Sequence, residues 1–281
     1  MTDEHVVPLS LGGQHVLEKA SCDDCAKITS KFERDVAREL WGDARISYGV
    51  PSRRKKARPS HVSLPDTTSQ TGRRVRVPYA DYPAPMVFYK MHQAGLLQGL
   101  PPAIDTSSGW LLVALFDKAK AANFKDKYGI EPSAKFRHVP QSFARLLAKI
   151  GYGHILTQLE PDDFNEFCVP YILGKNTNLS FIVGGSVEAI QADPKGSGHV
   201  LGTRLFGDLN RMILVAEIRL FANNETPLYH AVVGEITGRD NVLAAMRKLG
   251  SEGAEISPLL GSPDKAEHWH SKVWPIGTTQ K

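Results

Sequence analysis

The stretch EHVVPLSLGG at residues 4–13, followed by CDDC at residues 22–25, decides how the N-terminal part of the chain folds. Residues 4–7 predict a short strand, which Pro8 ends because proline offers no N–H to a central sheet position. The glycine pair that closes the first stretch supplies a turn in which a positive φ is cheap. Residues 15–17 then predict the returning strand of a hairpin.

A helix is predicted from Asp23 onwards, because four apolar residues recur at every fourth position and form one stripe. They are Ile28, Phe32, Val36 and Leu40. Gly42 is expected to end this helix. The predicted local order is therefore strand, turn, strand and helix, with a pair of cysteines at the helix entrance.

The neighbouring side chains of Glu4 and His5 suit metal-assisted hydrolysis of a phosphodiester. An imidazole can take a proton from water near neutral pH, and a carboxylate can hold Mg²⁺ or Mn²⁺ against the scissile phosphate. We therefore expect His5 to be the base and Glu4 a metal ligand. Neighbours on a strand point to opposite faces, so a bulge or a strand end is needed for both to serve one site. Pro8 favours such an end.

The acid–His strand, the glycine turn, the Cys-x-x-Cys pair and the helix together resemble the HNH endonuclease family in its ββα-metal form. The resemblance covers about the first 40 residues. It implies a metal-dependent endonuclease that hydrolyses DNA phosphodiester bonds, with His5 as general base and Glu4 at the acidic, metal-binding position. It also implies that Cys22 and Cys25 form the second half of a zinc knuckle.

Three features depart from the family's pattern. The other Cys pair of the knuckle, which precedes the acid–His strand in the family, is not found before Glu4, and Cys22 and Cys25 supply two of the four ligands that tetrahedral Zn²⁺ wants. Ala26 occupies the position where the family carries a His or Asn metal ligand, and the family's Asn between turn and Cys pair is missing. These features motivate an alternative: a catalytically decayed HNH-like protein that binds nucleic acid.

A basic run, RRKKAR at residues 53–58, lies between two prolines. Such a run is typical of an exposed, solvated connector. Next to a nuclease finger it could instead track the phosphates of DNA, with an affinity that falls as salt rises. The residues expected to bind nucleic acid in this way are Arg53, Arg54, Lys55 and Lys56. The net charge of +4 permits such binding without establishing it.

The remainder of the chain predicts a mixture of helices and strands. Helices are expected at residues 118–128, 141–159, 163–173 and 241–249. Strands are expected at residues 61–64, 74–77, 110–116, 179–183, 199–206, 212–222 and 229–233. The predicted fold is therefore α+β, divided into an HNH-like ββα finger (1–42), a basic linker (43–60) and an α+β domain (61–281). No group of residues in that last domain indicates a particular reaction. A third possibility is that this domain carries the main activity and acts on an unrelated ligand.

Three cysteines, Cys22, Cys25 and Cys168, are too few and too uneven for a disulfide framework, so we expect reduced thiols. Cys168 lies in an apolar pattern and is expected in the core. For the other two, the plainer alternative to a metal site is a pair of small buried residues at a helix start. No apolar run is long enough to span a membrane and no secretory signal is recognised, so a cytoplasmic location without membrane contact is expected. The sequence does not indicate an oligomeric state.

Overall fold

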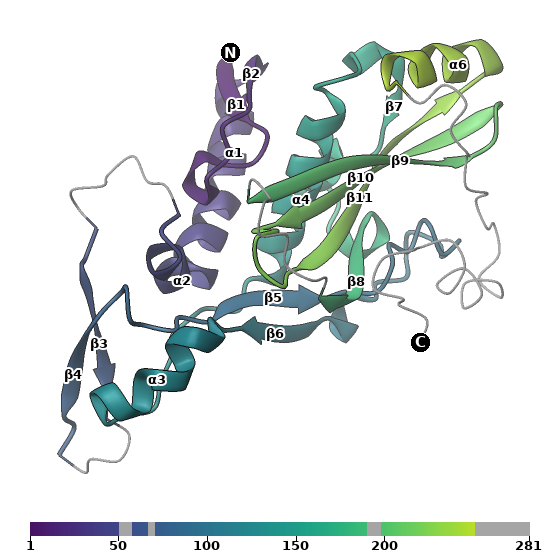
Figure 1. The fold of residues 1–281 in the computed structure, drawn as a ribbon. Coiled ribbons are helices and arrows are strands. Elements are labelled where there is room, and N and C mark those ends of the chain that lie inside the picture. The colour runs from purple at the N-terminus through teal and green to yellow at the C-terminus, as the bar shows by residue number, and fades with distance from the viewer. Residues whose placement is uncertain (51–57, 67–70, 190–197, 251–281) are drawn as a thin grey trace.

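The chain folds as a mixed α+β structure, and every pairing between its described strands is antiparallel (Figure 1). The predicted α+β class is therefore confirmed. None of the helices in the described part combines the length and the apolar character that a membrane crossing would need. The computed structural model describes residues 1–50, 58–66, 71–189 and 198–250.

The N-terminal unit is a hairpin followed directly by a helix. Strand β1 (Thr2–His5) pairs with β2 (Val16–Ser21), and helix α1 (Asp23–Arg34) comes next. Between the strands, the short 3-10 turn η1 (Leu9–Leu11) ends at Gly12, whose φ of 100° is a conformation that glycine adopts at little cost. The predicted order of strand, turn, strand and helix is confirmed, with shifted strand bounds.

The helix does not end where the sequence predicted. Helix α1 continues into the π-helical turn η2 (Asp35–Leu40), and Gly42 begins a further helix, α2 (Gly42–Ser47). Gly42 lacks the positive φ of a left-handed helix cap, which Gly49 adopts instead with a φ of 68°. The helical run therefore extends beyond the position expected for its end, because the left-handed residue lies after α2.

A five-stranded sheet is the largest layer of the molecule (Figure 1). Its strands follow the order β7 (Asn165–Glu166), β11 (Pro227–Thr237), β10 (Arg211–Leu220) and β9 (His199–Gly207), and β8 (Val183–Ala189) also pairs with β11. The last three strands predicted from the sequence are thus confirmed, and the hairpin between β10 and β11 is longer than expected.

Helix α4 (Pro140–Ile155) packs against β10 and β11 of this sheet. A Cβ added to Gly151 would lie 2.9 Å from the Cβ of Ala231 and 3.1 Å from that of Ala216. The glycine therefore allows the helix to approach the sheet closely. The helix predicted over residues 141–159 is confirmed, although it ends earlier.

Several further predictions from local pattern are also confirmed. Strands β3 (His61–Pro65) and β4 (Arg74–Pro78) pair as a hairpin. Helix α3 (Lys118–Tyr128) ends at Gly129, which has a φ of 67°. Helix α6 (Arg239–Lys248) lies near the end of the described chain.

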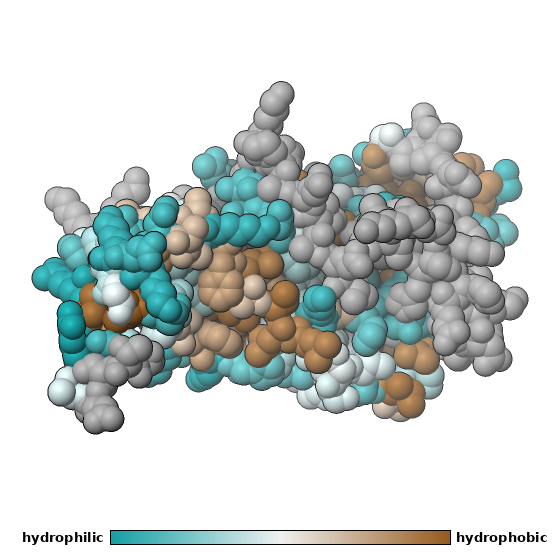
Figure 2. All heavy atoms as spheres, turned by 60° about the horizontal axis from the view of Figure 1, so that its bottom comes forward, coloured by the Kyte–Doolittle hydropathy of each residue, from teal (hydrophilic) through white to brown (hydrophobic). Residues whose placement is uncertain are grey.

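A further antiparallel pair joins β5 (Met86–Lys90) to β6 (Leu111–Leu115), which follows the 3-10 turn η4 (Ser107–Gly109). The apolar sequence of β6 predicted the strand correctly. Its first residues are nevertheless exposed, Leu111 to 64% and Leu112 to 44%. Figure 2 shows apolar residues gathered on the face of the molecule that lies at the bottom of Figure 1, where β5 and β6 are found.

The helix predicted over residues 163–173 is wrong for most of its length, because only residues 169–172 are α-helical. That segment contains the end of the 3-10 turn η5 (Pro161–Asp163), then strand β7, then the short helix α5 (Val169–Ile172). Strand β7 pairs with β11 beside Gly234, where a Cβ would lie 2.4 Å from a backbone oxygen of β7. Pairing with a strand distant in sequence therefore overrides the local helical pattern.

The strand predicted over residues 179–183 is also largely wrong. A 3-10 turn, η6 (Leu179–Phe181), occupies most of that segment, and β8 begins only at Val183. Carbonyl groups of η6 accept hydrogen bonds of 2.9 Å from the backbone N–H groups of Gly95 and Leu96. These carbonyl groups are therefore bonded to a loop that is distant in the sequence, and they do not pair with a neighbouring strand.

One cluster of buried apolar residues runs from the N-terminal unit through α4 into the large sheet. Trp41 lies at the junction, with its ring centroid 5.3 Å from that of Phe88, 5.7 Å from that of Phe143 and 5.3 Å from that of Phe221. Its indole N–H donates a 2.5 Å hydrogen bond to the Val87 carbonyl oxygen. The N-terminal unit therefore packs into a core that it shares with the rest of the chain.

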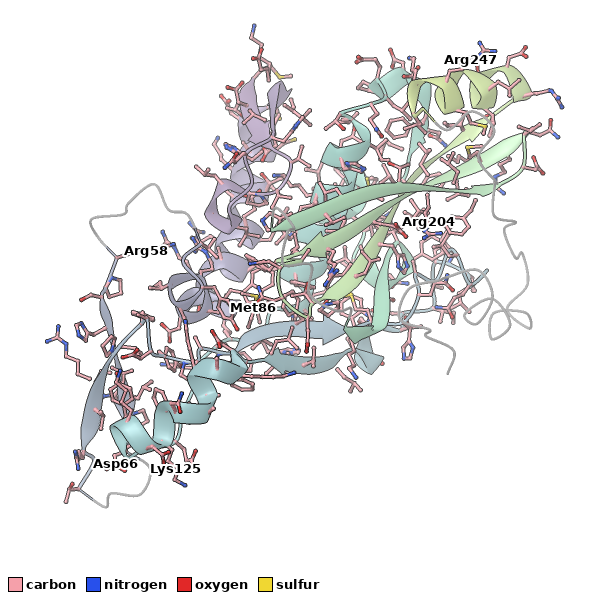
Figure 3. All side chains as sticks on the ribbon, in the orientation of Figure 1. Arg58, Asp66, Met86, Lys125, Arg204 and Arg247 are labelled. Carbon is pink, nitrogen blue, oxygen red and sulfur yellow. The ribbon has the colours of Figure 1, made fainter. Side chains whose placement is uncertain are left out.

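The segment expected to be a basic linker, residues 43–60, is described only in part. Helix α2 occupies its beginning, and Figure 3 shows Arg58 beside that helix. Residues 51–57 lie outside the described residues. The four residues predicted to bind nucleic acid are in this gap, and they are Arg53, Arg54, Lys55 and Lys56.

Candidate functional site

A buried lysine on α4 joins the hairpin to helix α1. The Nζ atom of Lys149 lies 2.6 Å from Glu4 Oε1 and 2.8 Å from Glu33 Oε1. It also donates a 2.5 Å hydrogen bond to the carbonyl oxygen of His5. The Lys149 side chain is only 6% exposed, and a buried ammonium is tolerated only when it is paired in this way. We call Glu4, Glu33 and Lys149 the lysine cluster.

The lysine cluster carries one more negative than positive charge when both carboxylates are ionised. The pKa of Glu33 is raised, chiefly because burial disfavours its charged form, while Lys149 opposes this effect and Glu4 adds to it. The cluster is therefore electrostatically suited to take up one further positive charge, either a proton or a metal ion.

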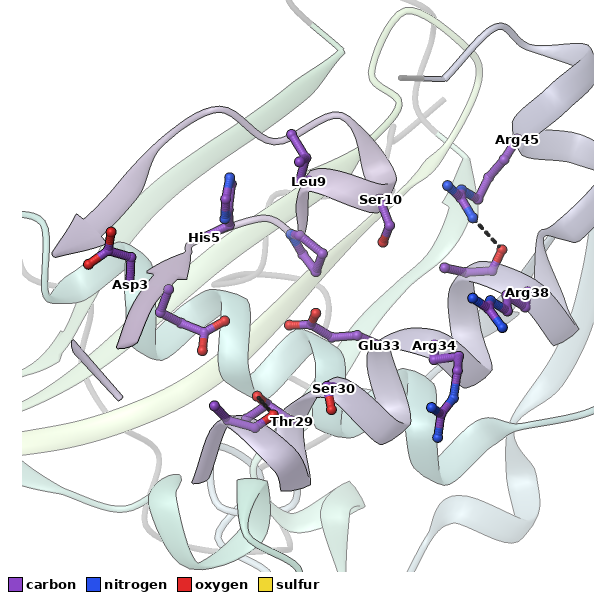
Figure 4. A pocket seen from close by; sticks show the side chains of 14 residues that line it. Asp3, His5, Leu9, Ser10, Thr29, Ser30, Glu33, Arg34, Arg38 and Arg45 are labelled. Atoms are coloured by element: carbon purple, nitrogen blue, oxygen red, sulfur yellow. Dashed lines mark hydrogen bonds between the residues drawn. The ribbon is translucent and has the colours of Figure 1, made fainter. Parts of the chain in front are cut away.

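His5 is the last residue of β1, and its imidazole points away from α1 and from the Glu33 carboxylate (Figure 4). The carboxylate of Glu4, by contrast, points toward α4 and pairs with Lys149. The register shift in the hairpin falls between Thr2 and Glu4, so it leaves the normal alternation between Glu4 and His5 in place. The bulge that would turn both side chains toward one cation is thus not found between them, and their joint use of one metal ion stays a prediction that rests on the strand end at His5.

Glu4 and His5 nevertheless line the same pocket, whose volume is about 580 Å³. Its wall runs from the hairpin along α1 and η2 to α2. Figure 4 shows Asp3 and His5 at one end, and the arginines at the other, with Glu33 between them. The arginines are Arg34, Arg38 and Arg45. One pocket thus has an acidic end with a histidine and a basic end.

The helix wall of this pocket carries Ala26, at the position where the HNH pattern has a metal ligand. The nearby hydroxyl groups bind the helix backbone: Thr29 donates to the Ala26 carbonyl oxygen over 3.2 Å and Ser30 to that of Lys27 over 3.0 Å. Among these residues of α1, Glu33 is therefore the one whose side chain could bind a metal ion in the pocket.

The two cysteines lie together at the start of α1, as predicted. Cys22 caps the helix, and its Sγ accepts a hydrogen bond of 3.3 Å from the backbone N–H of Cys25. This bond, together with one from the Cys25 thiol, lowers the pKa of Cys22, while the thiol contact raises the pKa of Cys25. Cys22 is exposed, so the alternative of two buried thiols does not hold for it.

A structural zinc ion does not fit the described residues alone. Zinc in such sites has four ligands, whereas Cys22 and Cys25 provide two. Across the described ranges, no group of three or more His, Cys, Asp or Glu side chains is placed to hold a metal. The described residues therefore do not complete the zinc knuckle that the family resemblance implies.

A magnesium or manganese ion needs fewer ligands from the protein than a structural zinc ion does. Mg²⁺ keeps several waters and is held by one or two carboxylates together with substrate phosphates. Glu4 meets Lys149 through Oε1, so its second oxygen can face a cation, and the lysine cluster has one excess negative charge when both of its carboxylates are ionised. Glu4 thus fits as a ligand in a site that a substrate phosphate would complete.

Sequence reasoning missed three of the residues that define this region. None of Glu33, Lys149 and Arg45 was among the site residues predicted from the sequence. Lys149 carried the clearest available signal, since it is a charged residue within the strongly apolar helix α4. Its partners are far away in the sequence, which is why the pattern alone could not assign them.

Comparisons of the chain with protein-family models, with curated proteins and with solved structures found no match. Inferences about function therefore rest on the chain's own residues and their arrangement.

Proposed function

We propose that this protein is a divalent-metal-dependent endonuclease of the HNH type that hydrolyses DNA phosphodiester bonds. The observation that carries the proposal is the pocket in the N-terminal unit. A strand, turn, strand and helix place Glu4 and His5 at one end of it and arginines at the other. Hydrolysis of a phosphodiester needs both kinds of group: a base that takes a proton from the attacking water, and cations that stabilise the negative charge of the phosphate.

Each residue has a definite role in this proposal. The His5 imidazole takes a proton from the attacking water, and Glu4 holds Mg²⁺ or Mn²⁺ beside the phosphate. When bound, the metal ion would offset the negative charge that builds up on the leaving oxygen. Lys149 is a positioning residue, because it holds both the Glu4 carboxylate and the His5 carbonyl group in place.

A plasmid-nicking assay with Mg²⁺ or Mn²⁺ tests the proposal. Substitution His5→Ala should reduce nicking by roughly 10²- to 10⁴-fold, the contribution usual for general acid–base catalysis. His92→Ala is the matched control, because His92 is exposed and lies outside the pocket. Absence of nicking with every metal, or equal nicking by wild type and His5→Ala, would contradict an endonuclease in which His5 is the base.

A second candidate function is favoured by two specific observations. The Glu4 carboxylate is already paired with Lys149, and Ala26 has no ligating atom. A catalytically decayed HNH-like protein that binds nucleic acid would need neither group for catalysis. It is distinguished by salt-dependent DNA binding that His5→Ala leaves unchanged, in the absence of any nicking.

A further inference from the structure

Arg45, on helix α2, has a hydrogen-bond donor that the described part of the chain leaves unused. Its Nη1 donates a 2.8 Å hydrogen bond to the Ala37 carbonyl oxygen, but its buried Nε has no hydrogen-bond partner among the described residues. Leaving a buried donor unsatisfied costs about 1–3 kcal/mol, more when the group is charged. A donor in this situation is well placed to bind a ligand that enters the pocket.

Two further arginines lie near Arg45. Arg38 is exposed and lines the same pocket (Figure 4). Arg58 lies beside α2 (Figure 3) and donates to the Val50 carbonyl oxygen. Burial lowers the pKa of Arg45 to about 10, and the positive charges of Arg58 and Arg38 contribute to the shift. We call Arg38, Arg45 and Arg58 the arginine cluster.

The acidic side chains of this region do not balance the arginine cluster. Asp35 Oδ1 lies 3.2 Å from Arg137 Nη2, and Glu39 Oε2 lies 3.8 Å from Arg137 Nε. Within the described ranges, no carboxylate comes within ion-pair distance of Arg38, Arg45 or Arg58. The cluster therefore holds repelling positive charges that a bound anion would stabilise.

We propose that the arginine cluster is a subsite for a phosphate group of a DNA strand. Guanidinium groups bind phosphate oxygens through paired, charge-assisted hydrogen bonds, and the unused Nε of Arg45 provides such a donor. The carboxylates at the opposite end of the pocket repel an anion, so they favour its binding at the arginine end. The identification of the phosphate as part of DNA rests on the proposed function, whereas phosphate binding does not require cleavage.

Binding of a short fluorescein-labelled DNA duplex, followed by anisotropy over a range of salt concentrations, tests this subsite. Arg38→Gln should weaken binding about tenfold at low salt and should lower the slope of log K against log salt by about 1, as expected for one lost phosphate contact. Arg137→Gln is the matched control, because Arg137 is an exposed arginine of the same region that already binds carboxylates.

A second variant separates the subsite from a general loss of positive charge. Arg45→Lys keeps the charge but removes the planar fork, so it should also weaken DNA binding, whereas Arg137→Gln should not. Unfolding temperatures measured without DNA show whether each variant is folded. Arg38→Gln, at an exposed position, remains informative if Arg45→Lys fails to fold.

Inorganic phosphate identifies the source of the ligand. Phosphate should compete with the duplex for the wild-type protein and should compete more weakly in Arg38→Gln. Phosphate binding that depends on Arg38, combined with DNA binding that does not, would overturn the proposal. Equal DNA affinity and equal salt slope in Arg38→Gln and Arg137→Gln would also overturn it. DNA binding that depends on Arg38 in a protein that never nicks DNA supports the subsite and counts against the proposed endonuclease alone.

Discussion

Two groups of charged side chains each contribute residues to the N-terminal pocket, and the groups differ in how their charges are balanced. The lysine cluster places one ammonium between two carboxylates and ties it to a backbone carbonyl. The arginine cluster gathers three guanidinium groups, to which the described residues offer carbonyl oxygens but no carboxylate. The lysine cluster can therefore hold the hairpin and the helices α1 and α4 together. In the arginine cluster, a bound anion would offset the repulsion between the guanidinium groups.

The largest expected effect comes from removing the cation of the lysine cluster. Lys149→Met keeps most of the side-chain volume but leaves two partly buried carboxylates facing each other, so it should lower the free energy of unfolding by about 3 kcal/mol. Urea denaturation measures this loss. Lys27→Met is a control, because Lys27 forms an exposed ion pair with Asp24. A similarly small loss in both variants would show that the lysine cluster does not stabilise the fold.

An intermediate effect is expected from the pH dependence of the lysine cluster. Burial raises the pKa of Glu33, so the folded state binds this proton more tightly than the unfolded chain does. The resulting stabilisation is complete below the pKa of an exposed glutamate and is lost as the pH rises through the raised value. Glu33→Gln lacks this titration, so the stability of the variant relative to wild type should increase as the pH rises from acidic to neutral.

Urea unfolding of wild type and Glu33→Gln at a series of pH values measures this difference. Glu225→Gln is a suitable control, since Glu225 pairs with Lys118 at an exposed position. If the stability difference between wild type and Glu33→Gln stays constant with pH, the titration of Glu33 does not contribute as described.

The smallest expected effect concerns the arginine cluster in the absence of a ligand. Arg38→Gln removes one of three repelling charges from an exposed position, so it should raise the free energy of unfolding by about 0.5 kcal/mol or less. Added phosphate should stabilise wild type more than the variant, because a ligand that binds the folded state raises its stability. Thermal unfolding with and without phosphate measures both effects. A clear loss of stability in phosphate-free Arg38→Gln would indicate that Arg38 has a stabilising role instead.

Much of the fold could be predicted wherever the signal was local. Helix α3 ends at Gly129 as its sequence indicates, and the arms of β3 and β4 pair as expected. The errors arose where a distant segment determines the conformation. The pairing of β7 with β11 displaces a helical pattern, and hydrogen bonds from a distant loop shape the turn η6.

The candidate site shows the same limit. The sequence pointed to Glu4, His5 and the cysteine pair, because their spacing is recognisable within a short stretch. It could not pair Glu4 with Lys149, which lies more than a hundred residues away, although a lysine within an apolar helix was a visible anomaly. The arginine cluster was equally hidden, because burial of the Arg45 Nε depends on packing and not on spacing.

The most direct test of the account is a parallel measurement of DNA binding and plasmid nicking, with Mn²⁺ present, in wild type, His5→Ala and Arg38→Gln. The account predicts that His5→Ala binds DNA like wild type but nicks it roughly 10²- to 10⁴-fold more slowly. It also predicts that binding and nicking fall together in Arg38→Gln. Undiminished nicking by His5→Ala, together with DNA binding that Arg38→Gln leaves unchanged, would contradict a pocket with a catalytic end and a phosphate-binding end.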